Sequence, residues 1–283
     1  MQVQRAKTAG FCMGVSLALH KLDNAIRKNQ DASKRLCTLG PIIHNPQVLA
    51  DYEAKGVTCL STPKGTTAND AVVIRAHGIT KEVEQELHQS GALIVDATCP
   101  KVKKAQTAIG TATADGSSLL LFGEADHPEV KGLVSYAKGE KFIFPDLATL
   151  KELTLSPDKS WVLASQTTQD ANVFTDICRY LENLLPRLTI LHTICDATGE
   201  RQKEASSIAT DVDAMVVVGG RQSGNTRRLV MLAAEKGITA YHVETISELS
   251  KDDFKGVSKV GLTAGASTPK ALIDEAEQWL TSL

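Results

Sequence analysis

Seven short apolar runs limit the folds that this chain can adopt. They lie in the segments 71–78, 92–100, 118–128, 161–168, 188–196, 214–220 and 260–268. Each run is continuous rather than alternating with polar residues, which is typical of a strand covered on both faces in a parallel sheet. Segments with helical spacing lie between the runs, for example Val15, Ala18, Leu22 and Ile26. The alternation predicts an α/β fold with parallel sheets flanked by helices.

The composition argues against several classes of protein. With 283 residues, 42% of them hydrophobic, the chain can bury a large core, and its length alone suggests about two domains. A formal net charge of −2 does not indicate a nucleic-acid partner or attraction to a membrane surface. The N-terminus lacks the pattern of a signal peptide, and no apolar run approaches the roughly 18 residues of a membrane span. We therefore expect a soluble, cytoplasmic protein.

The ends of the predicted strands are rich in ligating and hydrogen-bonding side chains. In open α/β sheets, ligands bind beyond the carboxyl ends of the strands. The residues found there are His77, Cys99, His127, Glu129, Thr167, Thr168, Cys195, Ser223, Asn225 and Ser267. We expect the functional site to be drawn from this set.

The six cysteines are too few for a disulfide scaffold in a chain of this length. Cys37 and Cys59 lie inside short apolar runs, and Cys178 lies beside the apolar stripe of a predicted helix. We interpret these three as small buried hydrophobes.

Cys12, Cys99 and Cys195 each precede a predicted helix start, where free N–H groups and the helix dipole favour a thiolate. Their separations of 87 and 96 residues (99 − 12 and 195 − 99) exclude a local C-x-x-C knuckle. The spacing fits three comparable units that each lend one thiolate to a common centre, such as a 4Fe–4S cluster with one open iron. Three unrelated buried cysteines are the alternative.

Two glycine-containing loops resemble anion-binding turns. Residues 219–226, GGRQSGNT, follow an apolar run and nearly match a phosphate-binding loop, but Asn225 replaces its lysine. That replacement argues against hydrolysis of a nucleoside triphosphate and leaves a backbone cradle for an anion. Residues 263–268, TAGAST, form a similar loop that carries Ser267. An ordinary tight turn between strand and helix is the alternative for either loop.

Three histidines lie in junctions marked by glycine or proline, namely His44, His77 and His127. A histidine in such a place can donate hydrogen bonds to a phosphate or transfer protons. Glu129 follows His127 by two residues and is a candidate proton donor.

Nine short motifs occur in one order between Cys12 and Ser267: GFCMGV, HN, AHG, DATCP, HPEVKG, QTT, C-x-A-T-x-x-R-Q, S-x-N and TAGAS. Together they closely resemble the LytB/IspH family, the 4-hydroxy-3-methylbut-2-enyl diphosphate reductases. The resemblance covers nearly the whole chain. It implies three similar α/β units arranged pseudo-threefold around a central iron–sulfur cluster. We expect these units at residues 1–98 with about 268–283, at 99–187 and at 188–267.

The resemblance also implies roles for individual residues. Cys12, Cys99 and Cys195 would bind the 4Fe–4S cluster, which becomes 3Fe–4S if the labile iron is lost. The residues expected to bind the substrate are His44, His77, His127, Thr168, Ser223, Asn225 and Ser267. Glu129, Thr167 and His127 would act in catalysis, with Glu129 central to protonation of the substrate hydroxyl.

The implied reaction is the reductive dehydroxylation of 4-hydroxy-3-methylbut-2-enyl diphosphate to isopentenyl and dimethylallyl diphosphate, the last step of the methylerythritol phosphate route. It implies an electron donor of the ferredoxin or flavodoxin type. Two departures from the family pattern stand out. Gly224 replaces a serine, which puts the affinity for the diphosphate in question, and ATGERQ replaces the commoner ATTNRQ.

Two rival functions remain at this point. An open-iron 4Fe–4S hydro-lyase would use its cluster only as a Lewis acid and would need no electron donor. A non-catalytic binding protein would have its cysteines in the core or at a zinc site.

Overall fold

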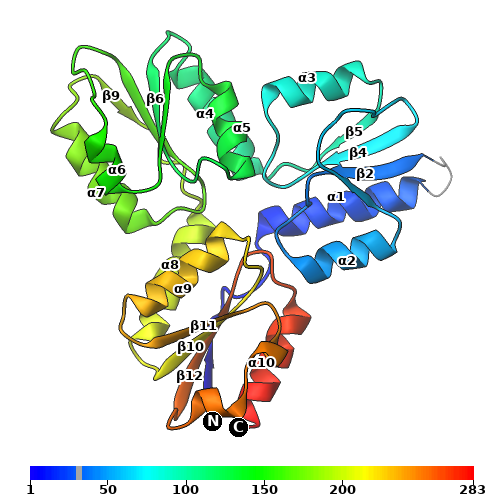
Figure 1. Cartoon of the computed structure of the whole chain (residues 1–283), viewed down its shortest axis with the longest axis vertical. Coiled ribbons are helices and arrows are strands. Elements are labelled where there is room, and N and C mark those ends of the chain that lie inside the picture. Colours follow the sequence, from blue (N-terminus) through cyan, green and yellow to red (C-terminus); the bar gives the residue numbers. More distant parts are fainter. Residues whose placement is uncertain (30–33) are drawn as a thin grey trace. The chain divides into compact units, whose positions relative to one another are not determined.

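The computed structural model describes residues 1–29 and 34–283, and it contains three parallel four-stranded sheets (Figure 1). The first sheet has the order β1 (Gln2–Arg5), β12 (Lys259–Ala264), β10 (Ala214–Val218), β11 (Thr239–Val243). The second has the order β3 (Thr58–Leu60), β2 (Arg35–Leu39), β4 (Asp70–Ile74), β5 (Leu93–Asp96). The third has the order β7 (Lys141–Phe144), β6 (Ser118–Phe122), β8 (Trp161–Ser165), β9 (Leu188–Ile190). The predicted α/β class with parallel sheets is confirmed.

Ten α-helices occur in the described residues: α1 (Met13–Asn29), α2 (Pro46–Ala54), α3 (Lys81–Gln89), α4 (Pro100–Ala112), α5 (Pro128–Tyr136), α6 (Leu147–Glu152), α7 (Ala171–Glu182), α8 (Asp196–Ala209), α9 (Gly224–Ala234) and α10 (Lys270–Thr281). Two short 3-10 helices, η1 (Ile246–Glu248) and η2 (Lys251–Phe254), follow β11. None of these helices combines the length and the hydrophobicity that crossing a membrane requires.

The chain divides into two compact units. The first contains 1–16, 43–52 and 196–283, and the second contains 17–42 and 53–195. The first sheet therefore belongs to the first unit, and the other two sheets belong to the second.

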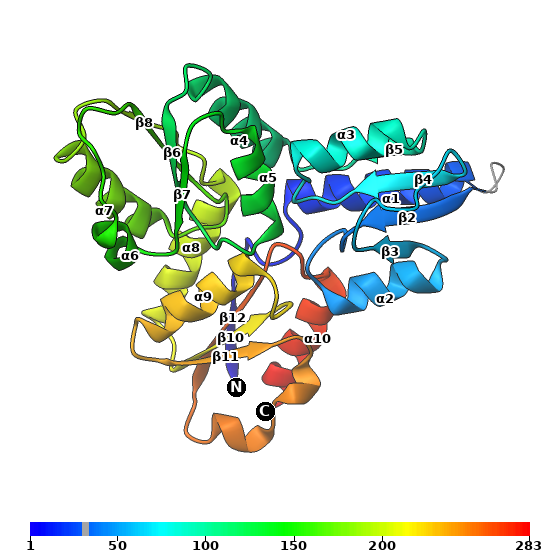
Figure 2. The ribbon, with the colours of Figure 1, turned by 45° about the horizontal axis from the view of Figure 1, so that its top comes forward.

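In the first unit, both faces of the sheet are covered by helices, which explains the continuous apolar runs. Val216 faces a core that includes Ile273 and Leu280 of α10. Its neighbour Val217 points to the opposite side, where it packs with Ile208 of α8 and Leu229 of α9. Figure 2 shows α8 and α9 side by side on that face.

The third sheet is built in the same way, within the second unit. Phe122 packs with Phe174 and Ile177 of α7 on one face. Leu121 packs with Ile109 of α4, together with residues of α5, on the other.

The N-terminal strand shares a sheet with the C-terminal part of the chain. Residues 2–5 pair in parallel with 259–262, and Arg5 forms ion pairs of 2.7 Å with Asp274 and Glu277 of α10. The expected boundaries instead assign β1 and α10 to the unit of 1–98 and β12 to that of 188–267. A pairing between the two ends of a chain leaves no local pattern in a sequence. The three-unit boundaries stay a prediction.

Candidate active site

Cys12, Cys99 and Cys195 occupy equivalent places in the three sheets. Each follows an edge strand, β1, β5 or β9, and each directly precedes a helix, α1, α4 or α8. In each case the cysteine N–H donates to the carbonyl that lies two residues beyond the end of the neighbouring strand. These bonds join Cys12 to Ala266 at 3.2 Å, Cys99 to Ala76 at 2.9 Å and Cys195 to Thr167 at 3.0 Å. The three sites are therefore repeats of one local structure.

The same equivalence relates the predicted substrate-binding residues. His77, Thr168 and Ser267 each lie three residues beyond the strand next to the cysteine's strand, namely β4, β8 or β12. The next strand inward in each sheet is β2, β6 or β10. Five residues beyond its end lies His44, His127 or Ser223, respectively. Each sheet is thus followed by one cysteine and by two further side chains in matching loops.

In the second unit, Glu129 is held by Thr167. Glu129 lies in the first turn of α5 and is only 1% exposed. One of its carboxylate oxygens accepts from the Thr167 N–H at 2.6 Å, and the other accepts from the Thr167 hydroxyl at 3.0 Å. Thr167 enters this contact because β6 and β8 are paired, which brings the loops that follow them together. Two residues expected to act in catalysis are thus in direct contact, and their catalytic roles stay a prediction.

Burial raises the pKa of Glu129 from 4.5 to about 7, although the two hydrogen bonds from Thr167 oppose this shift. Desolvation disfavours the charged carboxylate and is the largest effect on the pKa of this group. Near neutral pH, Glu129 is therefore partly protonated and partly ionised. A pKa in this range suits a residue that acts as a general acid or base.

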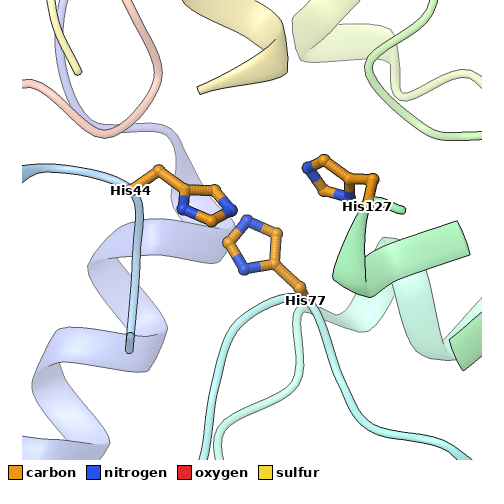
Figure 3. A group of neighbouring side chains, drawn as sticks. All are labelled: His44, His77 and His127. Carbon is orange, nitrogen blue, oxygen red and sulfur yellow. The ribbon is translucent and has the colours of Figure 1, made fainter. Parts of the chain in front are cut away.

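His127 is the N-cap of α5, and its Nδ1 accepts a hydrogen bond from the Glu129 N–H at 3.1 Å. A neutral His127 must therefore carry its proton on Nε2. The ring lies edge-on to His77, with 5.5 Å between the ring centroids and 81° between their planes, as Figure 3 shows. The loop after β4 and the loop after β6 thus place two imidazoles together in the second unit. The third histidine drawn in Figure 3, His44, lies just before α2 and belongs to the first unit.

In the first unit, Ser223 and Asn225 lie at the start of α9. Ser223 is the N-cap, and its hydroxyl oxygen accepts from the Thr226 N–H at 3.3 Å. Asn225 is only 4% exposed, yet its Nδ2 has no hydrogen-bond partner among the described residues. A buried donor without a partner costs free energy unless a ligand accepts its hydrogen bond. The helix N-terminus supplies further N–H groups, so this turn suits an anion.

Ser267 and His44 are joined directly within the first unit. The Ser267 hydroxyl donates to the His44 carbonyl at 3.0 Å. That carbonyl also lies so close to Gly220 that a Cβ there would approach its oxygen to 2.5 Å. Glycine at 220 therefore allows the loops of Ser223, Ser267 and His44 to approach one another.

The other three cysteines lie away from these loops. Cys37 and Cys178 are buried, as predicted for small hydrophobes, whereas Cys59 is exposed, so its interpretation as buried is wrong. Cys59 is the middle residue of β3, a three-residue edge strand, and its side chain faces solvent. An apolar run of that length does not distinguish an edge strand from a core strand.

Asn45 is a buried polar residue that was not among the residues predicted for the site. It is 1% exposed, its Oδ1 accepts from the Val48 N–H at 3.0 Å, and its Nδ2 has no partner in the described part of the chain. The adjacent His44 drew attention to the HN motif, but an asparagine before a Pro-led helix reads only as an N-cap.

Comparison with known proteins shows sequence similarity to one family over nearly the whole chain. The family model described as LytB protein matches residues 3–281. A 4-hydroxy-3-methylbut-2-enyl diphosphate reductase of Desulfovibrio desulfuricans is 61% identical over 286 residues, which cover 100% of both chains. One of Nitratidesulfovibrio vulgaris is 53% identical over 284 residues, again with 100% of both chains covered.

Two solved structures resemble this fold. The E-1-hydroxy-2-methyl-but-2-enyl-4-diphosphate reductase from Plasmodium falciparum matches with a TM-score of 0.93 at 25% identity, covering 99% of this chain and 88% of that one. A structure described as (E)-4-hydroxy-3-methyl-but-2-enyl diphosphate reductase, the terminal enzyme of the non-mevalonate pathway, matches with a TM-score of 0.70 at 35% identity, covering 100% of both.

Proposed function

Because this chain belongs to the LytB family, we propose that it removes the allylic hydroxyl of 4-hydroxy-3-methylbut-2-enyl diphosphate by reduction. The chain is an enzyme of the reductase class for which its relatives are named. The products are isopentenyl and dimethylallyl diphosphate, and the reaction is the terminal step of the non-mevalonate pathway, as for the related structure. The observation that carries the proposal is the repeat of one cysteine site in all three sheets.

The residues present fit a metal cluster, which the family implies. Cys12, Cys99 and Cys195 lie in matching positions and are not in disulfide bonds, and the described structure offers no fourth cysteine of this kind. Three thiolates are one fewer than a 4Fe–4S cluster normally takes, so one iron would be open to the substrate. When bound, such a cluster supplies a Lewis acid and a route for single electrons. Loss of the open iron would leave a 3Fe–4S cluster.

We assign the diphosphate to Ser223, Asn225 and Ser267, with His44 and His77. The support is the buried Nδ2 of Asn225, together with the free N–H groups at the start of α9. Binding of the diphosphate would orient the reacting carbon through interactions remote from it.

We assign the proton transfer at the hydroxyl to Glu129. Two electrons and two protons enter the reaction, the C–O bond breaks, water leaves and a C–H bond forms. The protonated Glu129 carboxyl would give its proton to the departing oxygen, and Thr167 would hold the carboxyl in place through its N–H and hydroxyl. His127, with its proton on Nε2, and Thr168 would contact the substrate nearby.

The partners follow from the same proposal. The reaction requires a one-electron donor, and a protein of the ferredoxin or flavodoxin type would supply the electrons. A cytoplasmic location is also part of the proposal, and six cysteines that form no disulfide bond agree with a reducing compartment.

An anaerobic assay with chemically reduced viologen tests the reductase activity. The substrate should be consumed only with the reductant, at two viologen radicals for each product formed. Turnover that continues without reductant would instead show a hydro-lyase. The variant Cys178→Ser is the matched control for Cys99→Ser, because Cys178 is buried among the apolar residues that pack around α7. Only Cys99→Ser should abolish the reaction.

A further inference from the structure

Helix α8 connects the cysteine at its own N-terminus to the segment that carries another. Its first residue, Asp196, directly follows Cys195. Two of its polar side chains, Arg201 and Glu204, reach the segment between β1 and Cys12. The contacts described below lie within the first compact unit.

Glu204 accepts three hydrogen bonds from two consecutive residues. Its carboxylate oxygens accept from the Lys7 N–H at 2.8 Å, the Thr8 N–H at 2.9 Å and the Thr8 hydroxyl at 2.5 Å. These bonds hold the pKa of Glu204 below its usual value, against the effect of burial. The carboxylate therefore remains charged at neutral pH and binds the segment through charge-assisted hydrogen bonds.

Arg201 binds the same segment from its carbonyl side. Its Nη1 donates to the Thr8 carbonyl, and it also lies 3.4 Å from the carbonyl of Ala264, the last residue of β12. The side chain is only 5% exposed. A guanidinium buried at this place satisfies one backbone carbonyl at the end of β12 and one in the loop that follows β1.

The segment is also fixed at its far end. The Cys12 N–H donates to the Ala266 carbonyl at 3.2 Å. Between the two anchors, Gly10 has a φ of 105°, and a Cβ there would approach Ile273 Cδ1 to 3.2 Å. Cys12 thus ends a short connection whose backbone groups are held by α8 at one end and by the β12–α10 loop at the other.

We propose that Arg201 and Glu204 are positioning residues that hold Cys12 in its ligating position. They would act through the backbone of Lys7 and Thr8, without touching substrate or cluster. The inference rests on the proposed function only because that function gives Cys12 a cluster to bind. The contacts of Arg201 and Glu204 with Lys7 and Thr8, called the clamp below, can be tested without a cluster.

The primary test measures the alkylation rate of Cys12 in the cluster-free protein. Each cysteine is followed by mass spectrometry after timed exposure to a maleimide under reducing-agent-free, anaerobic conditions. Glu204→Gln should raise the rate at Cys12 about tenfold, the factor expected for the loss of one hydrogen bond to a charged group. The rate at Cys99 should not change, because the Cys99 N–H is held by the Ala76 carbonyl within the second unit, whereas Glu204 binds Lys7 and Thr8 in the first.

Glu200→Gln is the matched control. Glu200 lies one turn earlier on the same helix and is exposed, so this variant makes the same change in charge without touching the segment. Equal Cys12 rates in Glu204→Gln, Glu200→Gln and the unchanged protein would overturn the proposal. A general rise at all six cysteines would also overturn it, since that would report unfolding rather than release of one segment.

Thr8→Val keeps the test decisive if Glu204→Gln fails to fold. It removes only the hydroxyl donor and leaves both N–H groups bound to Glu204. The Cys12 rate should then rise by about twofold to fivefold, with the thermal midpoint close to that of the unchanged protein. No rise would contradict the clamp.

A second readout uses the reconstituted protein. Iron release to a chelator should be faster in Glu204→Gln than in Glu200→Gln. If the unchanged protein binds no iron and sulfide, the proposed function fails, whereas the alkylation result still decides the clamp.

Discussion

Glu129 of the second unit already has hydrogen-bond partners for both carboxylate oxygens, whereas Asn225 of the first unit keeps a buried donor that has none among the described residues. Glu129 receives hydrogen bonds on both carboxylate oxygens from Thr167. Asn225 is buried nearly as deeply, but its Nδ2 has no partner in the described structure. The difference separates two tasks. A group that transfers a proton must be positioned before the substrate arrives. A group that binds an anion adds most to the binding free energy when its donor has no other partner before the anion binds.

The largest expected effect is on catalysis at Glu129. Glu129→Gln removes the proton donor but retains groups that can bond to Thr167. We expect kcat to fall by about 10²- to 10⁴-fold with little change in KM, measured with reduced viologen. Asp126→Asn is the control, because Asp126 is an exposed carboxylate on the same loop. Unchanged turnover in Glu129→Gln would remove this residue from the proton pathway.

The raised pKa of Glu129 should appear in the pH dependence of stability. Because its pKa rises from 4.5 to about 7 on folding, ionisation favours the unfolded chain, and the cost grows between these two pH values and is constant above about 7. Relative to the unchanged protein, Glu129→Gln should gain about 3 kcal/mol of unfolding free energy between pH 4.5 and pH 8. Urea unfolding of the cluster-free proteins at the two pH values measures this gain. A difference that does not vary with pH would show that the carboxyl is not desolvated.

The first unit should respond in binding rather than in catalysis. Asn225→Ala removes a donor that has no partner before the ligand binds, so the unfolding free energy should change by less than about 1 kcal/mol. KM should rise by about 10- to 100-fold, the range expected for a lost hydrogen bond to a charged group. Asn172→Ala is the control, because Asn172 is exposed at the same position of the first turn of α7. A fall in kcat with KM unchanged would reverse the division of tasks between the two units.

The smallest effect is expected from Gly224→Ser. It adds a hydroxyl at the first residue of α9, beside Ser223 and Asn225. We expect KM to fall by about twofold to tenfold, as for one additional neutral hydrogen bond. Gly199→Ser on α8 makes the same change where a Cβ would meet no atom within 4 Å. A rise in KM would show that the glycine is needed for close approach of the anion.

Much of this architecture could be predicted from the sequence. All seven predicted runs contain strands. Five of these strands, β4, β6, β8, β10 and β12, are central in their sheets, and a central parallel strand that is buried on both faces keeps a continuous apolar pattern. Four of the five strands not predicted, β1, β3, β7 and β11, are edge strands with partly exposed residues. Edge strands lose that pattern because one side meets solvent. The strands in the structure end earlier than the apolar runs, because the last residues of each run belong to the site loops.

The contacts within the site could not be predicted. Glu129 and Thr167 are 38 residues apart, and their contact depends on the pairing of β6 with β8. Glu204 had no motif to mark it, because its partners are mainly backbone groups of Lys7 and Thr8. Local patterns located the cysteines, because each directly precedes a helix. The equivalence of their anchoring hydrogen bonds could be recognised only from the order of the strands in each sheet.

The central claim is that three equivalent cysteines, one from each sheet, hold an iron–sulfur cluster. Counting iron and acid-labile sulfide in anaerobically purified protein, with an absorption spectrum, tests it most directly. We predict about four sulfides and three to four irons for each chain, with broad visible absorption that fades on reduction. Zinc without sulfide would contradict the account.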